Sequence, residues 1–434
     1  MKKAVLDINA LERFILKMEM EVLLHDDLMQ NLASKLKKTK DKYKHAIEIE
    51  RILLELSQVE DEVAFNEIYN AFSTKRIEGT ALCFGDVFSI VNYNVGARDI
   101  TYSIKNHKIN AEIFNPEIGR AELYKVANAI KGVGEKVVVN SIQAFEACFE
   151  ELLYYLVKTN PDTYLHDKQI KFADIVKSNI EEITASVIHE KVDGLMYAVT
   201  KTISQINAAH KLGLERHQSI WDDYVEMDLH RDIIVHNNGI VNAEYKEKVP
   251  KKYKDIEVGE YLRCDAACIK KKTDNLIKFA FLLYYLVGEG NDQLQHLDNI
   301  AFTLLKKRNW DVAEYAYSLL LKIPSLEHYY KMMYMLNMLN AKKHRLGLEA
   351  TREEILKIDT TGMEKNFVVA KKMLLEDYAS IEKDLEECYP KHFNTSAIYS
   401  WPIFIDFRKT EYYAKFIDKH SEDFECYNYR PELS

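Results

Sequence analysis

Glycine and proline are scarce in this sequence, whose 434 residues include only 14 Gly and 7 Pro. β-Sandwiches and β-barrels need many turns, and tight turns depend heavily on these two residue types. The scarcity therefore predicts a mainly α-helical protein with long helices. A chain of this length rarely folds around one hydrophobic core, so we expect two or three domains.

The composition excludes several other classes of protein. Apolar residues make up 47% of the chain and charged residues 29%, the balance of a folded, soluble protein. No apolar run approaches the roughly 18 residues of a membrane span, and residues 1–7 do not resemble a signal peptide. Cys264 and Cys268 are four residues apart, but no histidine or second cysteine pair nearby could complete a zinc site. We interpret the six scattered cysteines as reduced thiols of a cytoplasmic protein that needs no metal or other cofactor.

Hydrophobic patterns divide the chain into three segments. Residues 1–135 form a mostly helical N-terminal region, with β-branched and aromatic residues that allow a small hairpin near 83–120. Residues 136–290 are again helical and end near the glycine-rich linker signal at 288–292. Residues 291–434 form a C-terminal domain of helical hairpins. There, the aromatic and small residues of 309–317 resemble the second helix of a tetratricopeptide-type repeat.

The most informative segment runs from Leu229 to Asn242. Val225, Leu229 and Ile233 are four residues apart and predict a buried stripe, which leaves Arg231 free to face a cleft. Asn238-Gly239 is a helix C-terminal signal, because glycine readily adopts the left-handed conformation. His236 then lies in the last helical turn, where a histidine can serve general acid–base chemistry at neutral pH.

Arg231 and His236 point about 140° apart on a regular helix, which turns by about 100° per residue. They can converge if the helix loosens at Asn237-Asn238. Alternatively, a partner chain can bring a second copy of the pair to the opposite side of a shared cleft. Both arrangements are compatible with the sequence.

The pattern Arg231-Asp232-x-x-x-His236, followed by Asn-Asn-Gly, resembles the R-x4–6-H signature of HEPN domains. The resemblance covers about residues 136–290. The acid-rich segment 145–151 resembles the first helix of that domain, residues 191–195 resemble its middle, and residues 259–287 resemble its last helix. The resemblance implies a central helical bundle that works as a metal-independent endoribonuclease. It also implies a homodimer with two motifs lining one cleft, and an effector role in antiviral defence, abortive infection or a toxin system.

The resemblance also implies a role for individual residues. His236 would act as general acid or base on the ribose 2′-OH or the leaving 5′-oxygen, and Arg231 would hold the scissile phosphate. Asp232 would orient one of them, and Asn237 could donate to the phosphate. The acidic residue often found on the first helix would be Glu146 or Glu150.

Lysines follow the motif directly. The net charge of −9 argues against a protein that coats nucleic acid with its whole surface, but it allows a local basic site. We therefore expect an RNA-binding surface made by Lys246, Lys248, Lys251 and Lys252.

A second interpretation needs no catalysis. Arg231 and Asp232 would then be surface charges, and His236 would only stabilise a helix end. The protein would be a non-catalytic HEPN-like scaffold that binds a protein or nucleotide partner. The C-terminal hairpins would hold a protein in both interpretations: a regulatory partner of the ribonuclease in the first, and the partner of the scaffold in the second.

Overall fold

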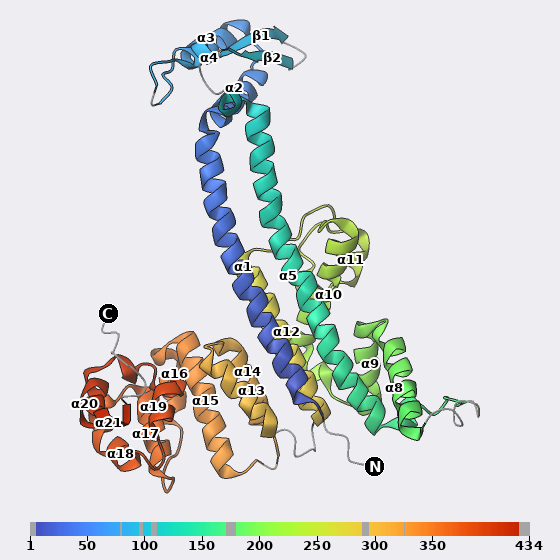
Figure 1. The fold of residues 1–434 in the computed structure, drawn as a ribbon, viewed down its shortest axis with the longest axis vertical. Coiled ribbons are helices and arrows are strands. Elements are labelled where there is room, and N and C mark those ends of the chain that lie inside the picture. The colour runs from blue at the N-terminus through green and yellow to red at the C-terminus, as the bar shows by residue number, and fades with distance from the viewer. Residues whose placement is uncertain are drawn as a thin grey trace. The chain divides into compact units, whose positions relative to one another are not determined.

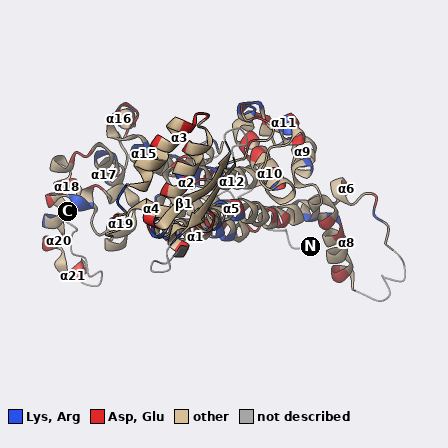
Figure 2. Ribbon diagram, turned by 90° about the horizontal axis from the view of Figure 1, so that it is seen from above, with Lys and Arg blue, Asp and Glu red and all other residues tan. Residues whose placement is uncertain are grey.

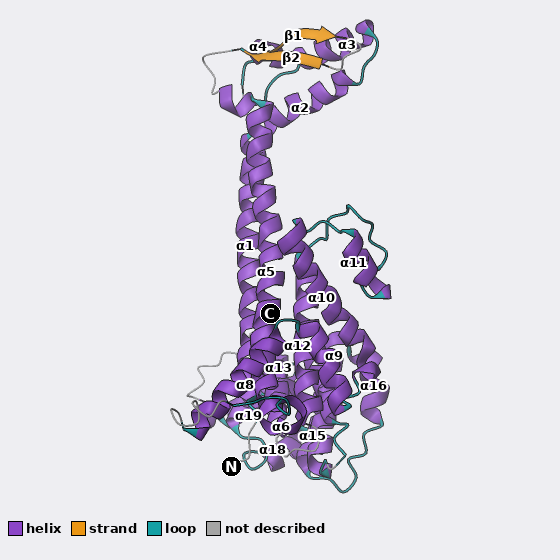
Figure 3. Cartoon of the chain, turned by 90° about the vertical axis from the view of Figure 1, so that its right-hand side faces the viewer, coloured by secondary structure: helices purple, strands orange, loops and turns teal. Residues whose placement is uncertain are grey.

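The computed structural model describes residues 6–78, 80–94, 99–105, 111–170, 179–288, 295–324 and 326–424. Within these ranges the chain is mainly α-helical, with one two-stranded antiparallel sheet (Figures 1 and 3). The predicted mainly α class is therefore confirmed. None of the described helices combines the length and the hydropathy that a membrane span requires.

The described chain folds into two compact units. One, here the hairpin unit, contains residues 21–137 and 263–269; the other, the main unit, contains residues 1–20, 138–262 and 270–434. This division differs from the three expected segments, because α1 (Ile8–Lys42) and α5 (Pro116–Thr159) each continue from one unit into the other. The segments 136–290 and 291–434 fall almost entirely within the main unit. Residues 289–292 of the expected linker lie outside the described residues.

The hairpin unit contains the β-hairpin, and α1 and α5 run side by side in it (Figures 1 and 3). Its strands pair with Phe88 opposite Ile104, within the stretch expected to form a hairpin; the turn at 95–98 is not described. Gly134 of α5 lets residues 263–269 approach closely, since an added Cβ would lie 2.4 Å from the carbonyl oxygen of Cys264. The elements of this unit besides α1 and α5 are α2 (Lys44–Ser57), α3 (Glu62–Ser73), α4 (Phe84–Val87), β1 (Phe88–Asn94), β2 (Asp99–Ile104) and the 3₁₀-helix η1 (Ala111–Phe114).

The central helices of the main unit meet at three aromatic rings. Phe145 of α5 lies 5.0 Å from Tyr224 and 5.5 Å from Phe279 between ring centroids, and Tyr224 stacks on Phe279 at 4.5 Å. All three side chains are buried. The helices of this region, besides α1 and α5, are α6 (Pro161–Tyr164), α8 (Ile180–Met196), α9 (Val199–His210), η2 (Leu214–His217), α10 (Gln218–Asn237), α11 (Ala243–Lys248), η3 (Lys251–Tyr253) and α12 (Ala266–Gly288).

A buried carboxylate also connects α10 to its neighbours. Glu226 forms an ion pair with Lys272 of α12, and its Oε1 accepts a hydrogen bond of 3.3 Å from the hydroxyl of Tyr245 on α11. His230, one turn further along α10, places its Nδ1 3.7 Å from the same carboxylate. Because Glu226 is almost fully buried, its charge depends on these partners for stabilisation.

The C-terminal helices pack one against the next, from α13 to α18. Ala313 and Ala316 of α14 are fully buried, and their small side chains allow close packing of the neighbouring helices. Buried Lys343 joins α15 to later segments through ion pairs with Glu376 at 2.8 Å and Asp406 at 2.9 Å. The likeness to tetratricopeptide-type repeats stays a prediction. The elements are α13 (Gln295–Lys306), α14 (Trp310–Leu320), α15 (His328–Leu346), α16 (Leu348–Leu356), α17 (Lys365–Leu375), η5 (Tyr378–Ser380), α18 (Glu382–Cys388), α19 (Thr395–Ser400), η6 (Pro402–Phe404), η7 (Phe407–Lys409), α20 (Glu411–Lys419) and α21 (Ser421–Phe424).

Lys272→Ala should destabilise the protein by about 3 kcal/mol, because it leaves the carboxylate of Glu226 buried without its cation. Lys271→Ala is the matched control, since Lys271 is exposed and should change the free energy of unfolding by less than about 0.5 kcal/mol. Urea denaturation of both variants measures the difference. Equal stabilities would show that the Glu226–Lys272 pair does not hold α10 to α12.

Candidate active site

The end of α10 has the geometry that its sequence predicts. The helix is regular through Asn237, and then Asn238 (φ 52°) and Gly239 (φ 76°) both adopt the left-handed conformation. The amide of Gly239 donates to the carbonyl of Ile233 at 2.9 Å, which closes the helix end. The side-chain amide of Asn237 donates to the carbonyl of Ile240, so this residue stabilises the turn after the helix.

The buried face of α10 differs from the predicted stripe. Of the three expected residues only Ile233 is fully buried, whereas Val225 and Leu229 are partly exposed. The buried face instead includes Tyr224, Glu226, Met227, His230 and Ile233. The apolar pattern missed it because Glu226 and His230 are polar residues that are buried through internal partners.

Arg231 lies in a group of carboxylates. Its Nη2 contacts Oδ1 of Asp228 at 2.7 Å and Oε1 of Glu146 at 3.4 Å, and its Nε lies 3.4 Å from Oδ1 of Asp232. Burial opposes the charged guanidinium, but the hydrogen bond to Asp228 and the carboxylate charges outweigh it and raise the pKa of Arg231. None of these contacts uses Nη1, so part of the guanidinium remains available to a ligand.

The structure distinguishes between the two glutamates of α5. Glu146 follows the buried Phe145 and reaches Arg231, whereas Glu150 is exposed one turn further along the helix. Burial raises the pKa of Glu146; Arg231 opposes this shift, while Asp228 and Asp232 add to it. Glu146 is therefore the acidic residue beside the motif.

Asp232 interacts electrostatically with both Arg231 and His236. Burial raises its pKa, the charges of Asp228 and Glu244 raise it further, and the charges of Arg231 and His236 lower it. His236 itself is exposed. Together with Asp232 it lines a hollow of about 210 Å³ between α10 and α11, whose other walls are Leu229, Ile233, Asn242, Glu244 and Tyr245.

Arg231 and His236 face different neighbours. Arg231 points towards α5, where Glu146 lies, and His236 points into the hollow beside α11. Because α10 stays regular through Asn237, the loosening that would bring the two side chains together in one chain is not present. The other arrangement, in which a partner chain supplies a second copy, stays a prediction.

The lysines after the motif have different surroundings. The ammonium of Lys246 donates to the carbonyls of Lys254 at 2.8 Å and Ile256 at 2.6 Å, and Lys252 donates to the carbonyl of Ser219 at 2.7 Å. These two lysines therefore hold loops in place. Lys248 forms an exposed pair with Glu244, and Lys251 is exposed. Around them, α10 carries several acidic residues and α11 carries both signs (Figure 2).

The sequence interpretation missed two residues that support Arg231. Asp228 is three residues before Arg231 on α10, a spacing at which opposite charges pair on a helix. Thr200 of α9 holds Asp228 in place, because its Oγ1 donates to Oδ2 of that carboxylate at 2.7 Å. The i, i+3 spacing could have identified Asp228, whereas Thr200 is far away in sequence.

No group of three or more metal-ligating side chains with suitable geometry is found among the residues that the structure describes.

His230 should make folding sensitive to acid. It is almost fully buried, and burial, followed by the charge of Lys272, lowers its pKa well below the ordinary value. Glu226 lies close enough to favour protonation, but Lys272 already neutralises that carboxylate. The folded state therefore keeps His230 neutral, while in the unfolded chain it binds a proton below about pH 6.5. Above that pH, His230 is neutral in both states and does not affect the free energy of unfolding. As the pH falls below it, only the unfolded chain binds the proton, so the free energy of unfolding decreases.

When the pH is lowered from about 7.5 to about 5.5, the free energy of unfolding should decrease for both proteins. The decrease should be about 1 kcal/mol larger for the wild type than for His230→Leu. Urea denaturation across this range measures the effect. Above about pH 7.5 the two curves should run in parallel, because histidines are then neutral in both states. Parallel curves across the whole range would contradict the neutral, buried state of His230.

In comparisons with known proteins, the chain matches no protein-family model, no curated protein and no solved structure. The resemblance to HEPN domains therefore rests on the motif of α10 and its sequence surroundings.

Proposed function

We propose that this protein is a metal-independent endoribonuclease whose active site is built on the last two turns of α10. One observation carries the proposal: Asp232 interacts with both Arg231 and His236, while His236 lines an open hollow. A phosphate-binding cation, an orienting carboxylate and an exposed general acid or base are the groups that cleavage of RNA requires.

The proposed reaction uses the RNA's own 2′-hydroxyl. Its oxygen attacks the adjacent phosphorus while the bond from phosphorus to the 5′-oxygen breaks, leaving a 2′,3′-cyclic phosphate and a free 5′-hydroxyl. His236 takes the proton of the 2′-hydroxyl or gives one to the leaving 5′-oxygen. Arg231 stabilises the extra negative charge on the phosphate through its Nη1, which is not used in the three carboxylate contacts.

The two proton transfers favour a homodimer. One His236 supplies either the base or the acid, and a second copy of the chain supplies the other. Apolar side chains four residues apart on the part of α1 that belongs to the hairpin unit offer a surface for such a partner: Leu24 is 54% exposed and Leu28 is 48% exposed. Exposed apolar stripes on helices are common sites of protein association.

RNA binding would use the basic residues that remain exposed. Lys248 and Lys251 are the better candidates, because Lys246 and Lys252 are engaged with backbone carbonyls.

A free cytoplasmic ribonuclease would damage its own cell, so we infer that activity is restrained until needed. The resemblance places such enzymes in antiviral defence, abortive infection and toxin systems, and a regulatory protein held by the C-terminal hairpins could provide the restraint.

One observation favours the non-catalytic alternative, a helical scaffold for a protein or nucleotide partner. Three carboxylates surround Arg231, so its charge is already compensated within the protein. A phosphate would have to compete with them. The two functions differ in a single outcome, which is whether the purified protein cuts RNA.

Purified protein incubated with total cellular RNA in excess EDTA should produce discrete fragments with 2′,3′-cyclic phosphate ends. His236→Ala should abolish cleavage, lowering the rate by at least about 100-fold, because it removes the acid–base group. His189→Ala is the matched control, since His189 is also exposed on a helix but lies on α8. Gel electrophoresis and end-group analysis of the fragments measure the result.

The control variant should cut like the wild type, and both variants should keep the wild-type circular dichroism spectrum. Cleavage that survives His236→Ala, or that EDTA stops, would reject this active site. If the purified protein cuts no RNA either as a monomer or as a dimer, that result would favour the scaffold function.

Leu24→Lys should convert a dimer to a monomer, because it places a charge in the exposed apolar stripe of α1. Gln30→Lys adds the same charge to an exposed polar position of that helix and should leave the dimer intact. Sedimentation velocity measures the mass of each variant. A monomeric wild type, or a dimer that tolerates Leu24→Lys, would exclude α1 as the dimer surface.

A further inference from the structure

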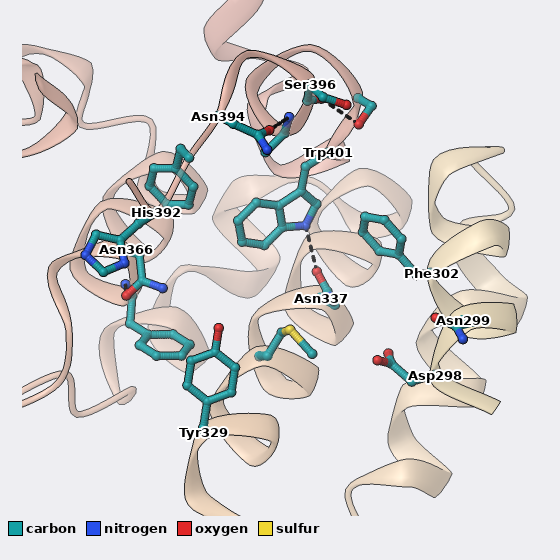
Figure 4. Close-up of a pocket in the computed structure, with 15 residues that line it drawn as sticks. Asp298, Asn299, Phe302, Tyr329, Asn337, Asn366, His392, Asn394, Ser396 and Trp401 are labelled. Atoms are coloured by element: carbon teal, nitrogen blue, oxygen red, sulfur yellow. Dashed lines mark hydrogen bonds between the residues drawn. The ribbon is translucent and has the colours of Figure 1, made fainter. Parts of the chain in front are cut away.

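A pocket of about 380 Å³ lies among the C-terminal helices of the main unit, far along the sequence from the α10 motif (Figure 4). Its walls come from α13, α15, α17, α19 and the residues that flank α19. A volume of this size is in the range of small-molecule sites, roughly 300 to 1,000 Å³. The walls are mostly aromatic and amide side chains.

Hydrogen bonds fix the orientation of one aromatic wall. The indole Nε1 of Trp401 donates to Oδ1 of Asn337 at 2.9 Å, and Nδ2 of Asn337 donates to the hydroxyl of Tyr317 at 3.1 Å. Asn337 and Tyr317 are buried, so this chain of bonds is protected from water. The indole ring is therefore held in place before any ligand arrives, which lowers the entropic penalty of binding.

An aspartate without a cationic partner lies in the same pocket. The carboxylate of Asp298 on α13 makes no hydrogen bond or ion pair within the described part of the chain, and it points inwards in Figure 4. Burial raises its pKa from 3.8 to about 6, and among the described residues its charge acts on the phenols of Tyr317 and Tyr334. His392 also lines the pocket, and its Nδ1 lies 3.6 Å from Oε2 of Glu364.

The charges of the walls indicate which ligands fit. Neither Lys nor Arg is among the described residues that line the pocket, so a phosphate or another anion finds no lysine or arginine there, and the one histidine, His392, pairs with Glu364. The faces of Trp and Tyr rings attract cations, and a carboxylate without a partner adds a full negative charge. We propose that this pocket binds an organic cation, an alkylammonium or guanidinium group, with Asp298 as its counter-ion and Phe302, Tyr329 and Trp401 as its walls.

Such a group has two sources. It can be a free small molecule, or it can be the side chain of a lysine or arginine in a peptide. The chemistry at Asp298 is the same in both cases. The proposal does not depend on ribonuclease activity, because the pocket shares no residue with the α10 site.

Isothermal titration calorimetry of the full chain tests the proposal with matched pairs of probes. Choline is compared with 3,3-dimethyl-1-butanol, its neutral carbon analogue. The peptide acetyl-Gly-Arg-Gly-amide is compared with the same peptide carrying citrulline, a neutral analogue of arginine. At least one cation should bind with a Kd below about 10 mM, and its neutral analogue at least about tenfold more weakly. Binding of choline indicates a free cation, and binding of the arginine peptide alone indicates a peptide.

Asp298→Asn separates binding from folding. It should weaken binding of the cation at least about tenfold, because the counter-ion is lost. The same variant should raise the melting temperature above about pH 6, since the charged, partly buried carboxylate destabilises the free protein there. That gain should shrink towards about pH 4, where Asp298 is protonated in the folded state.

Glu349→Gln is the control, because it removes an exposed carboxylate of α16 and should leave both affinity and melting temperature unchanged. The proposal is overturned if no cation binds at about 10 mM, or if the neutral analogues bind as well as the cations. It is also overturned if Asp298→Asn binds the cation with unchanged affinity.

Discussion

The packing of Phe145 against Tyr224 and Phe279 determines the geometry of the candidate active site. Buried aromatic rings provide large contact areas and accept few orientations, so they fix the rotation of α5 and α10 against each other. Glu146 directly follows Phe145, and Arg231 lies two turns after Tyr224 on the same face of α10. The contact between Glu146 and Arg231 is therefore a consequence of core packing. A shift of either helix by one residue would turn these polar groups away from each other.

This packing produces a site with more carboxylates than cations. Glu146, Asp228 and Asp232 surround one guanidinium, and burial raises the pKa of both Glu146 and Asp232. The carboxylates hold Arg231 in one orientation, but they also repel an incoming phosphate. Protonation of Glu146 or of Asp232 would reduce that repulsion without moving Arg231. The same charges that order the site can therefore restrain it.

The sequence predicted features that depend on local chemistry. The scarcity of Gly and Pro predicted long helices, and Asn238-Gly239 predicted the end of α10 because left-handed residues close helices there. Features that depend on distant contacts were not accessible. Glu146 could not be chosen over Glu150, since the choice depends on how α5 is rotated against α10. Lys246 resembled a phosphate-binding residue, but its acceptors are carbonyls of a loop eight and ten residues later.

Buried charged groups in the described chain have partners of opposite charge, whereas the partly buried Asp298 does not. Glu226 has Lys272, and Lys343 has Glu376 and Asp406, because a charge removed from water destabilises a protein unless an opposite charge compensates it. Asp298 has no ion-pair partner among the residues that the structure describes, and burial raises its pKa. A cation bound at Asp298 would supply the missing partner, and binding that favours the folded state stabilises it. Since the pocket walls come from α13, α15, α17 and α19, the stabilisation would extend over the C-terminal helices rather than remain at one side chain.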